Sequence, residues 1–413
     1  MYVSQLDRPW IETPFLFQGF EIRSEEDIQT LARYCRHVYV DTPEILPFAP
    51  RKREPLPRQP TTTGVEYETP PSRHAGYEVL KTVQGRGPVP AYTDKTTLEE
   101  ELSAVREHHQ QARALVYTLM EDARHGKSLN TLAAKQAVGK VVESVIRNPD
   151  ALTCFIQLKR KDEYTAQHSL RVCILAVAFG RHLGLDPEEL QTLGVGALLH
   201  DIGKMKVPNA ILNKPGRLDK HEYAIMRTHV PKGVEILEKT RNVPTAALEV
   251  VRCHHERYNG NGYAAGLRGE QIGLFGAIGG IVDCYDAITS DRAYHTGMSA
   301  HAALKKMYEW RTRDFHPHLV EQFIPCMGIY PIGSIVELIT GEVGVVVTLN
   351  RLRRLKPRVK LVLRPNYTPY EVTETVDLMH HKTREGRLCE IIKVLEPGTH
   401  GINPVQYLPV AAA

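Results

Sequence analysis

Apolar residues recur with a period near 3.6 over most of residues 96–328, a pattern that predicts helices. Two long helices are expected first, over 96–126 and 129–148. Further helix starts are marked by capping signals, since Asp186 and Asp219 each stand three residues before a glutamate. The central part of the chain is therefore predicted to be helical.

The N-terminal part has a mixed pattern. Residues 1–42 contain strand-like runs on either side of a helical segment, for which Ser24 is the expected N-cap. Residues 42–97 are rich in proline and polar residues, and proline blocks both helices and central strands. We expect a small α/β domain followed by a linker or loosely ordered arm.

From about Tyr330 the hydrophobic period changes from 3.6 to 2. Two β-rich runs flank Gly341-Glu342, as in a hairpin, and further strands are expected in 358–366 and 388–395. This pattern predicts a small β-barrel or sheet at the C-terminus.

The expected fold class is therefore a multidomain, mainly α protein, in which a small β domain follows a helical domain. The expected domains are 1–45 (small α/β), 46–95 (Pro-rich linker or arm), 96–147 (connecting helices), 148–328 (helical) and 329–413 (small β).

Composition narrows the class of protein further. The 413 residues carry a formal net charge of +4, too small to indicate nucleic-acid binding by itself. No apolar stretch is long enough to span a membrane, and the first residues do not resemble a signal peptide. The seven cysteines are scattered and form no CxxC pair, which favours reduced thiols and a cytoplasmic protein.

Histidines and aspartates gather at the predicted helix ends. His168 opens one helix, His200-Asp201 and His254-His255 end two others, and His229 is expected near the end of a fourth. Asp283 lies within an apolar helix, where burial is costly unless a cation or another partner is present. Adjacent His-Asp or His-His pairs cannot point the same way on a helix, but they can contact two ions.

This residue set favours transition metals. Imidazole and carboxylate ligands without thiolate suit Fe or Mn, or less specifically Zn, better than Ca or Mg. Two such ions about 4 Å apart would suit hydrolysis of a phosphodiester. Each histidine taken alone is more often a surface or core residue, so the prediction rests on the whole set.

Five segments carry a family resemblance: "YTAQHS", "LLHDIGK", "MRTHVPKG", "HHERYNGNGYAAGLRGEQI" and "DCYDAITSDRAY". In this order and spacing, over about residues 148–328, they resemble the HD-GYP family of the HD superfamily, metal-dependent phosphodiesterases of cyclic di-GMP. The N-terminal stretch also resembles a domain of unknown function, DUF3391. The resemblance therefore implies an all-helical HD-type metal-binding domain preceded by a DUF3391-like domain.

The resemblance also implies roles for individual residues. The implied metal ligands are His168, His200, Asp201, His229, His254, His255 and Asp283. Asp201 would bridge two ions and would act in catalysis with His200 and Lys204. The implied substrate contacts are Lys204, Arg292, His295 and Tyr263. For Lys204 and Arg292 the alternative interpretation is a surface ion pair.

Three positions depart from the family pattern. Some members place a glutamate four residues before the first histidine to support a third metal; that position is Tyr164 here, with Glu163 one residue away, so two divalent ions are expected. Ala264 replaces the proline of the GYP motif, which changes the loop but no ligand. His295 stands where the family has a basic substrate contact.

We expect hydrolysis of cyclic di-GMP by water activated at the metal site, giving pGpG first and GMP in a possible second step. The alternatives are a cyclic di-GMP receptor or scaffold with a dormant site, and a phosphohydrolase of another nucleotide. The resemblance suggests diguanylate cyclases (GGDEF proteins) or other signalling proteins as partners of an N-terminal domain that regulates the protein or forms a homodimer. Seven basic residues in 350–365 could contact RNA, but a solvated strand face is the preferred interpretation.

Overall fold

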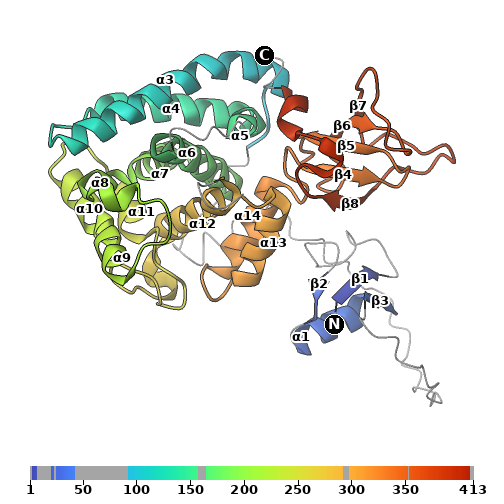
Figure 1. Cartoon of the computed structure of the whole chain (residues 1–413), viewed down its shortest axis with the longest axis horizontal. Coiled ribbons are helices and arrows are strands. Elements are labelled where there is room, and N and C mark those ends of the chain that lie inside the picture. The colour runs from blue at the N-terminus through green and yellow to red at the C-terminus, as the bar shows by residue number, and fades with distance from the viewer. Residues whose placement is uncertain are drawn as a thin grey trace. The chain divides into compact units, whose positions relative to one another are not determined.

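A computed structural model of the chain describes residues 2–6, 20–22, 25–41, 92–156, 164–291, 297–351 and 353–409 (Figure 1). The chain divides into two compact units, Met1–His74 and Ala75–Ala413.

The first unit is a small α/β structure. Its elements are β1 (Tyr2–Leu6), β2 (Phe20–Glu21), α1 (Glu25–Tyr34) and β3 (Val38–Asp41). The antiparallel sheet has the order β2-β1-β3, and Val3 packs against Leu31 and Cys35. The sequence predicted α1 and β3 but missed β1, whose apolar alternation is weak. Ser24 lies outside the described residues, as do residues 42–91 of the Pro-rich segment.

The second unit begins with a helical body. Its α-helices are α3 (Leu98–Arg124), α4 (Thr131–Arg147), α5 (Pro149–Ile156), α6 (Tyr164–Leu183), α7 (Pro187–Leu199), α8 (Asn209–Leu212), α9 (Lys220–Arg227), α10 (His229–Glu238), α11 (Ala247–Cys253), α12 (Leu274–Thr289), α13 (Ala300–Trp310) and α14 (Pro317–Met327). Two short 3₁₀ helices, η2 (Ile202–Lys206) and η3 (Gly269–Ile272), lie between them.

The predicted capping signals operate as expected. The Asp186 and Asp219 side chains accept hydrogen bonds from the backbone N–H groups of Glu189 and Glu222, and those glutamates bond back to the cap residues. Each cap satisfies N–H groups that a helix start leaves unpaired. These caps fix where α7 and α9 begin.

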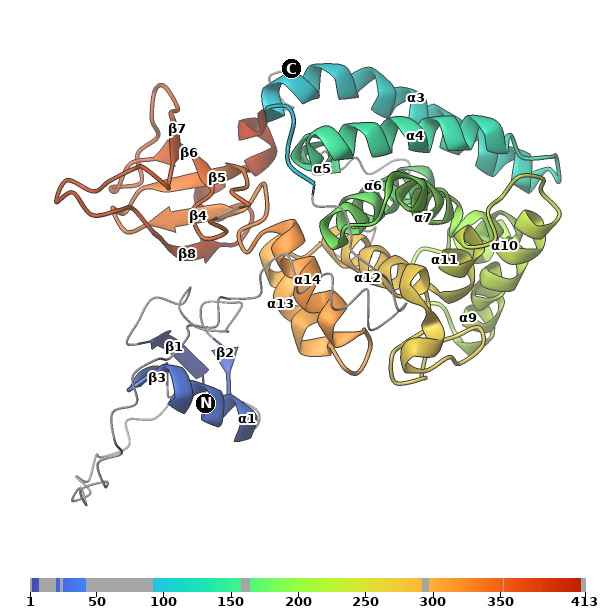
Figure 2. The ribbon, with the colours of Figure 1, turned by 180° about the vertical axis from the view of Figure 1, so that it is seen from behind.

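At the centre of the helical body lies α6, which packs against α3, α4, α7, α12 and α14. The side chains from Leu170 to Phe179 are buried, as expected for a helix that other helices surround. Figure 2 shows α6 and α7 enclosed between the α3–α4 pair and α12.

One helix boundary was predicted wrongly. We expected His229 near the end of a helix, but α9 ends at Arg227 and His229 is the first residue of α10. Pro231 is the third residue of α10, where its missing N–H would have no acceptor within the helix. Pro231, two residues after His229, therefore marks the first turn of a helix.

The C-terminal part is an open antiparallel sheet with the order β7-β6-β5-β4-β8. Its strands are β4 (Ile335–Leu338), β5 (Val343–Thr348), β6 (Arg358–Leu363), β7 (Thr375–Asp377) and β8 (Ile391–Leu395), followed by η4 (Thr399–Gly401) and η5 (Pro404–Tyr407). The hairpin predicted around Gly341 is confirmed, with Ile335 opposite Val345. Gly341 has a φ of +82°, which glycine adopts without steric cost.

A charged junction joins this sheet to the helical body. Arg351, in the loop after β5, contacts the carboxylates of Asp94 and Asp150, and Asp94 also pairs with Arg181 of α6 at 2.7 Å. Asp150 is 4% exposed, and a buried charge is costly unless it is paired. Arg351, from the C-terminal part, supplies the compensating charge.

Among the described helices, none is both long and apolar enough to cross a lipid bilayer.

Candidate metal centre

Seven side chains from five helical segments meet inside the helical body. His168 lies in the second turn of α6, His200 directly follows α7, and Asp201 precedes η2. His229 begins α10, His254-His255 follows α11, and Asp283 lies within α12. These are the seven residues that the sequence analysis selected as metal ligands, and six of them are buried.

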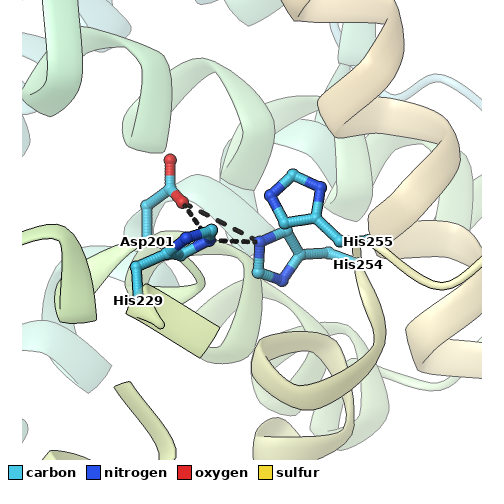
Figure 3. Close-up of side chains that lie close together, drawn as sticks. All are labelled: Asp201, His229, His254 and His255. Atoms are coloured by element: carbon cyan, nitrogen blue, oxygen red, sulfur yellow. Dashed lines mark hydrogen bonds and ion pairs between the residues drawn. The ribbon is translucent and has the colours of Figure 1, made fainter. Parts of the chain in front are cut away.

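The seven side chains form two adjacent groups. In one, ligand atoms of Asp201, His229, His254 and His255 lie within 4.8 Å of one another; in the other, those of His168, His200 and Asp283 do so. Figure 3 shows the first group, with the Asp201 carboxylate facing the rings of His229 and His254.

Asp201 stands between the two groups. Its Oδ1 is 3.4 Å from His229 Nε2, whereas its Oδ2 is 3.3 Å from His200 Nε2 and 3.6 Å from His168 Nε2. In the second group, Asp283 Oδ1 is 3.1 Å from His168 Nε2. Each Asp201 oxygen therefore faces its own set of imidazoles.

Backbone carbonyls determine which imidazole nitrogen carries the proton. Nδ1 of His200, His229 and His254 lies 2.8, 2.8 and 3.0 Å from carbonyl oxygens three residues earlier. A carbonyl oxygen only accepts, so Nδ1 must donate, and in the neutral ring Nε2 then carries a lone pair. All three lone pairs face the cluster.

The cluster contains polar atoms that protein groups do not satisfy. Within the described part of the chain, His200 Nε2 and Asp201 Oδ1 are buried without a hydrogen-bond partner. His229 Nε2 and His254 Nε2 are only 3.3 Å apart, an unfavourable contact for two lone pairs unless a cation or proton lies between them. Unsatisfied buried polar atoms are costly, and a bound cation would satisfy all of these.

In the first group, the protonation states also suit cation binding. Burial lowers the pKa of His229 and His254, and it lowers that of His255 to about 3, so these rings are neutral. Burial acts to raise the pKa of Asp201, but Lys204 and His200 outweigh it and hold this pKa well below its usual range. Neutral imidazoles around ionised carboxylates are the donor set of a divalent-metal site.

A second layer orients His168. Its Nδ1 lies 2.7 Å from Asp286 Oδ2, and Asp286 also accepts two hydrogen bonds from the Arg171 guanidinium, at 2.6 and 2.9 Å. Asp286 is fully buried. Against the effect of burial, Asp283 and Asp286 raise the pKa of His168 to about 9. Carboxylate partners of this kind commonly hold metal-binding histidines in one orientation.

The role of Asp286 was not predicted. The available signal was its position three residues after Asp283, which places both carboxylates on the same face of an otherwise apolar helix.

Close backbone approach explains why glycine occurs beside the ligands. A Cβ on Gly203 would lie 1.9 Å from the His229 carbonyl oxygen and 2.4 Å from the Gly233 nitrogen. The turn that carries Asp201 and Lys204 therefore packs directly on the first turn of α10.

The loop after His255 is held by a buried carboxylate. Glu256 is 3% exposed and accepts hydrogen bonds from the backbone N–H groups of Ala265, Gly266 and Leu267, at 2.7 to 3.1 Å. The sequence analysis did not identify this anchor. The Ala264 side chain is exposed, and it belongs to neither group of clustered ligand atoms.

The predicted substrate contacts are only partly described. Lys204 Nζ lies 2.5 Å from Asp201 Oδ2 at the edge of the cluster. The Tyr263 ring stacks on His255, with 4.6 Å between ring centroids. Arg292, His295 and Glu163 lie outside the described residues, and Tyr164 is the first residue of α6.

Known proteins resemble both parts of the chain. A family model described as an HD domain matches residues 154–319, and one described as a domain of unknown function (DUF3391) matches residues 1–134.

A cyclic di-GMP phosphodiesterase of Pseudomonas aeruginosa is 37% identical over 87% of this chain and 82% of its own length. A 3′3′-cGAMP-specific phosphodiesterase of Vibrio cholerae is 34% identical over 40% of this chain and 32% of its own. Among solved structures, an HDG"Y"P protein of Bdellovibrio bacteriovorus aligns with a TM-score of 0.47 and 21% identity, over 56% of this chain and 73% of that one.

Proposed function

The chain belongs to the HD-GYP family of HD-domain phosphodiesterases, and from this premise we propose that it hydrolyses cyclic di-GMP at the His/Asp cluster. The observation that carries the proposal is the position of Asp201, whose two oxygens face separate sets of imidazole nitrogens. A carboxylate in this position can be shared by two cations.

We propose that two divalent ions bind here. His229, His254 and His255 would hold one, His168, His200 and Asp283 the other, and Asp201 would contribute one oxygen to each. Imidazole and carboxylate donors without thiolate favour Fe or Mn. When bound, such ions supply Lewis acidity, which activates water and stabilises charge on phosphate oxygens.

The protein residues would position the substrate and compensate its charge. Lys204 is partly exposed beside Asp201, where its ammonium group can bind a non-bridging phosphate oxygen. Burial of the cluster excludes bulk water from the reacting phosphate, which strengthens these charge interactions. Hydrolysis would form a bond from the water oxygen to one phosphorus and break the bond from that phosphorus to the ribose 3′-oxygen. The water oxygen stays in the 5′-phosphate of linear pGpG, and the 3′-oxygen takes up a proton released by the water to become a hydroxyl group.

The proposal extends to the location, the regulation and the remaining substrate contacts of the enzyme. We place the reaction in the cytoplasm. The DUF3391-like domain would regulate the enzyme, through a diguanylate cyclase partner or a homodimer. Arg292 would contact a phosphate, and His295 would contact the substrate.

The decisive experiment is hydrolysis of cyclic di-GMP by protein loaded anaerobically with Fe(II) or Mn(II). We expect metal-dependent turnover in the native protein and its loss in Asp201→Ala, because that substitution removes an oxygen from both groups. Separation of nucleotides over time gives the ratio of pGpG to GMP. Metal-loaded native protein that binds cyclic di-GMP but leaves it intact would replace the enzyme proposal with a receptor.

A further inference from the structure

A stack of side chains extends outward from the cluster. The Tyr263 ring lies against His255 at an interplanar angle of 26°, and the Arg227 guanidinium carbon lies 4.5 Å from the Tyr263 ring centroid. The Tyr223 ring meets Tyr263 edge-on at 6.3 Å between centroids, and its own centroid is 6.0 Å from the Arg227 guanidinium. One aromatic ring therefore separates Arg227 from a candidate metal ligand.

Arg227 is oriented by this stack, yet its hydrogen-bond donors are unused. It is exposed, and across the described residues its guanidinium has no hydrogen-bond acceptor or carboxylate partner. Neighbouring arginines differ: Arg252 pairs with Glu238, and Arg257 donates to backbone carbonyls. The contact with the Tyr263 ring positions the guanidinium group and leaves its N–H groups available to a ligand.

The Tyr223 ring provides a second feature of a nucleobase site. It is 48% exposed, although burial of a large aromatic side chain is favourable in free energy. Exposed aromatic rings beside cationic side chains bind nucleobases by stacking. Tyr223 and Arg227 lie one helical turn apart on α9, so both side chains occupy the same face.

We propose that Arg227 and Tyr223 form a base-recognition site that selects guanine over adenine in a cyclic dinucleotide whose phosphate lies at the cluster. The inference rests on the proposed function and specifies its substrate. Guanine presents two acceptors, O6 and N7, which a planar guanidinium binds with two parallel hydrogen bonds. Adenine presents the N6 amino group beside N7, so a guanidinium would meet a donor there.

A phosphate is the other ligand that an arginine commonly binds. Lys204 already lies beside Asp201, whereas Arg227 is one ring farther out, beyond Tyr263. A nucleotide bound by its phosphate at the cluster extends outward through its sugar to its base. The geometry therefore favours a base at Arg227.

The test compares native protein with Arg227→Ala, Arg227→Lys and Tyr223→Ala. Arg106→Ala, at an exposed position of α3, serves as the matched control. Dissociation constants for cyclic di-GMP, 3′3′-cGAMP and cyclic di-AMP are measured by calorimetry in EDTA, where no metal-dependent turnover interferes. The kcat/KM for each nucleotide is then measured in Mn(II).

We expect Arg227→Ala to weaken cyclic di-GMP binding about 10- to 100-fold, from the loss of a bidentate base contact, and cyclic di-AMP binding by less than about threefold. Arg227→Lys should fail to restore the preference for guanine, because lysine lacks the planar fork. Tyr223→Ala should weaken binding of all three nucleotides through lost stacking.

An equal loss for the three nucleotides in Arg227→Ala, recovered by lysine, would show a phosphate contact and overturn the proposal. Unchanged affinities, with unchanged ratios of kcat/KM among the three nucleotides in Arg227→Ala, would overturn it as well. If the guanine preference depends on Arg227 but no nucleotide is hydrolysed in metal, base recognition stands and the proposed hydrolysis falls.

Discussion

At the scale of single residues, the cluster depends on hydrogen bonds that are made away from it. Three histidines donate from Nδ1 to carbonyls in the last turn of a helix, and His168 donates to Asp286. The carbonyls near a helix end lack intrahelical partners, so they are available to bond a ring. Placing histidines at helix ends therefore supplies both the ligand and its orientation.

The Asp286→Asn variant tests this second layer. Its one remaining side-chain oxygen can accept from His168 or from Arg171, while its amide nitrogen faces the other donor. We expect Mn(II) affinity to fall about 10- to 100-fold. Competition with a fluorescent chelator measures that affinity, and circular dichroism checks folding.

Asp291→Asn, at an exposed carboxylate just beyond α12, is the control and should keep native affinity. If Asp286→Asn lowers the melting temperature while Mn(II) affinity stays native, Asp286 is a structural residue only.

Sequence patterns predicted individual residues better than their partners. The seven clustered residues were identified because each lies in a short local motif. Asp286 and Arg171 are 115 residues apart, and Arg227 and Tyr263 are 36 apart, so these pairings exist only after the helices pack. A carboxylate within an apolar helix can be recognised in the sequence, but the distant residue that pairs with it cannot.

At the scale of elements, two glycines bring η2 and α10 together. The Gly203 Cα faces the backbone of His229 and Gly233, with no room for a side chain. This contact sets the separation between Asp201 and His229, which belong to different segments.

The Gly203→Ala substitution should therefore destabilise the fold and separate the two ligands. We expect a loss of about 3 kcal/mol in the free energy of unfolding, from overpacking against backbone. Gly139→Ala is the control: it lies within α4, with the nearest atom 4.0 Å from an added Cβ.

That control should gain about 0.5–1 kcal/mol, since alanine is the better helix former. Urea titration measures both. Equal stability of the two variants would show that the backbone at Gly203 can adjust.

Elements whose ends carry strong signals were predicted well, and those without them were not. Capping boxes gave the starts of α7 and α9. The boundary between α9 and α10 was missed because the chain continues in near-helical geometry through Thr228, with no polar cap. Strand β7, with three residues, depends on pairing with β6 for its existence.

At the scale of the whole molecule, the junction between the sheet and the helical body is rich in cations. His182, near the end of α6, is partly buried there with its Nε2 3.3 Å from Gln322 Oε1. Burial lowers the pKa of His182 to about 4, and Arg354 and Arg351 act in the same direction. The junction therefore requires a neutral imidazole.

This predicts an acid-sensitive junction. Because the folded-state pKa lies below the ordinary value of 6.5, the contribution of His182 to stability is complete above about pH 6.5 and is lost as pH falls toward 4. The loss is at most about 3 kcal/mol. Thermal unfolding of native protein and His182→Gln between these pH values measures it.

The variant should lose less stability on acidification than the native protein. His221→Gln, at an exposed position of α9, should behave like the native protein. Parallel pH curves for native protein and His182→Gln would contradict the prediction.

The clustered residues extend from position 168 to position 283 and come from five separate segments. A chain still emerging from the ribosome has neither Asp283 nor the helix that places it until nearly the whole helical body has been synthesised. A truncated or nicked chain likewise lacks part of the set. The complete ligand set would therefore exist only once α12 has been synthesised, and shorter chains would be inactive.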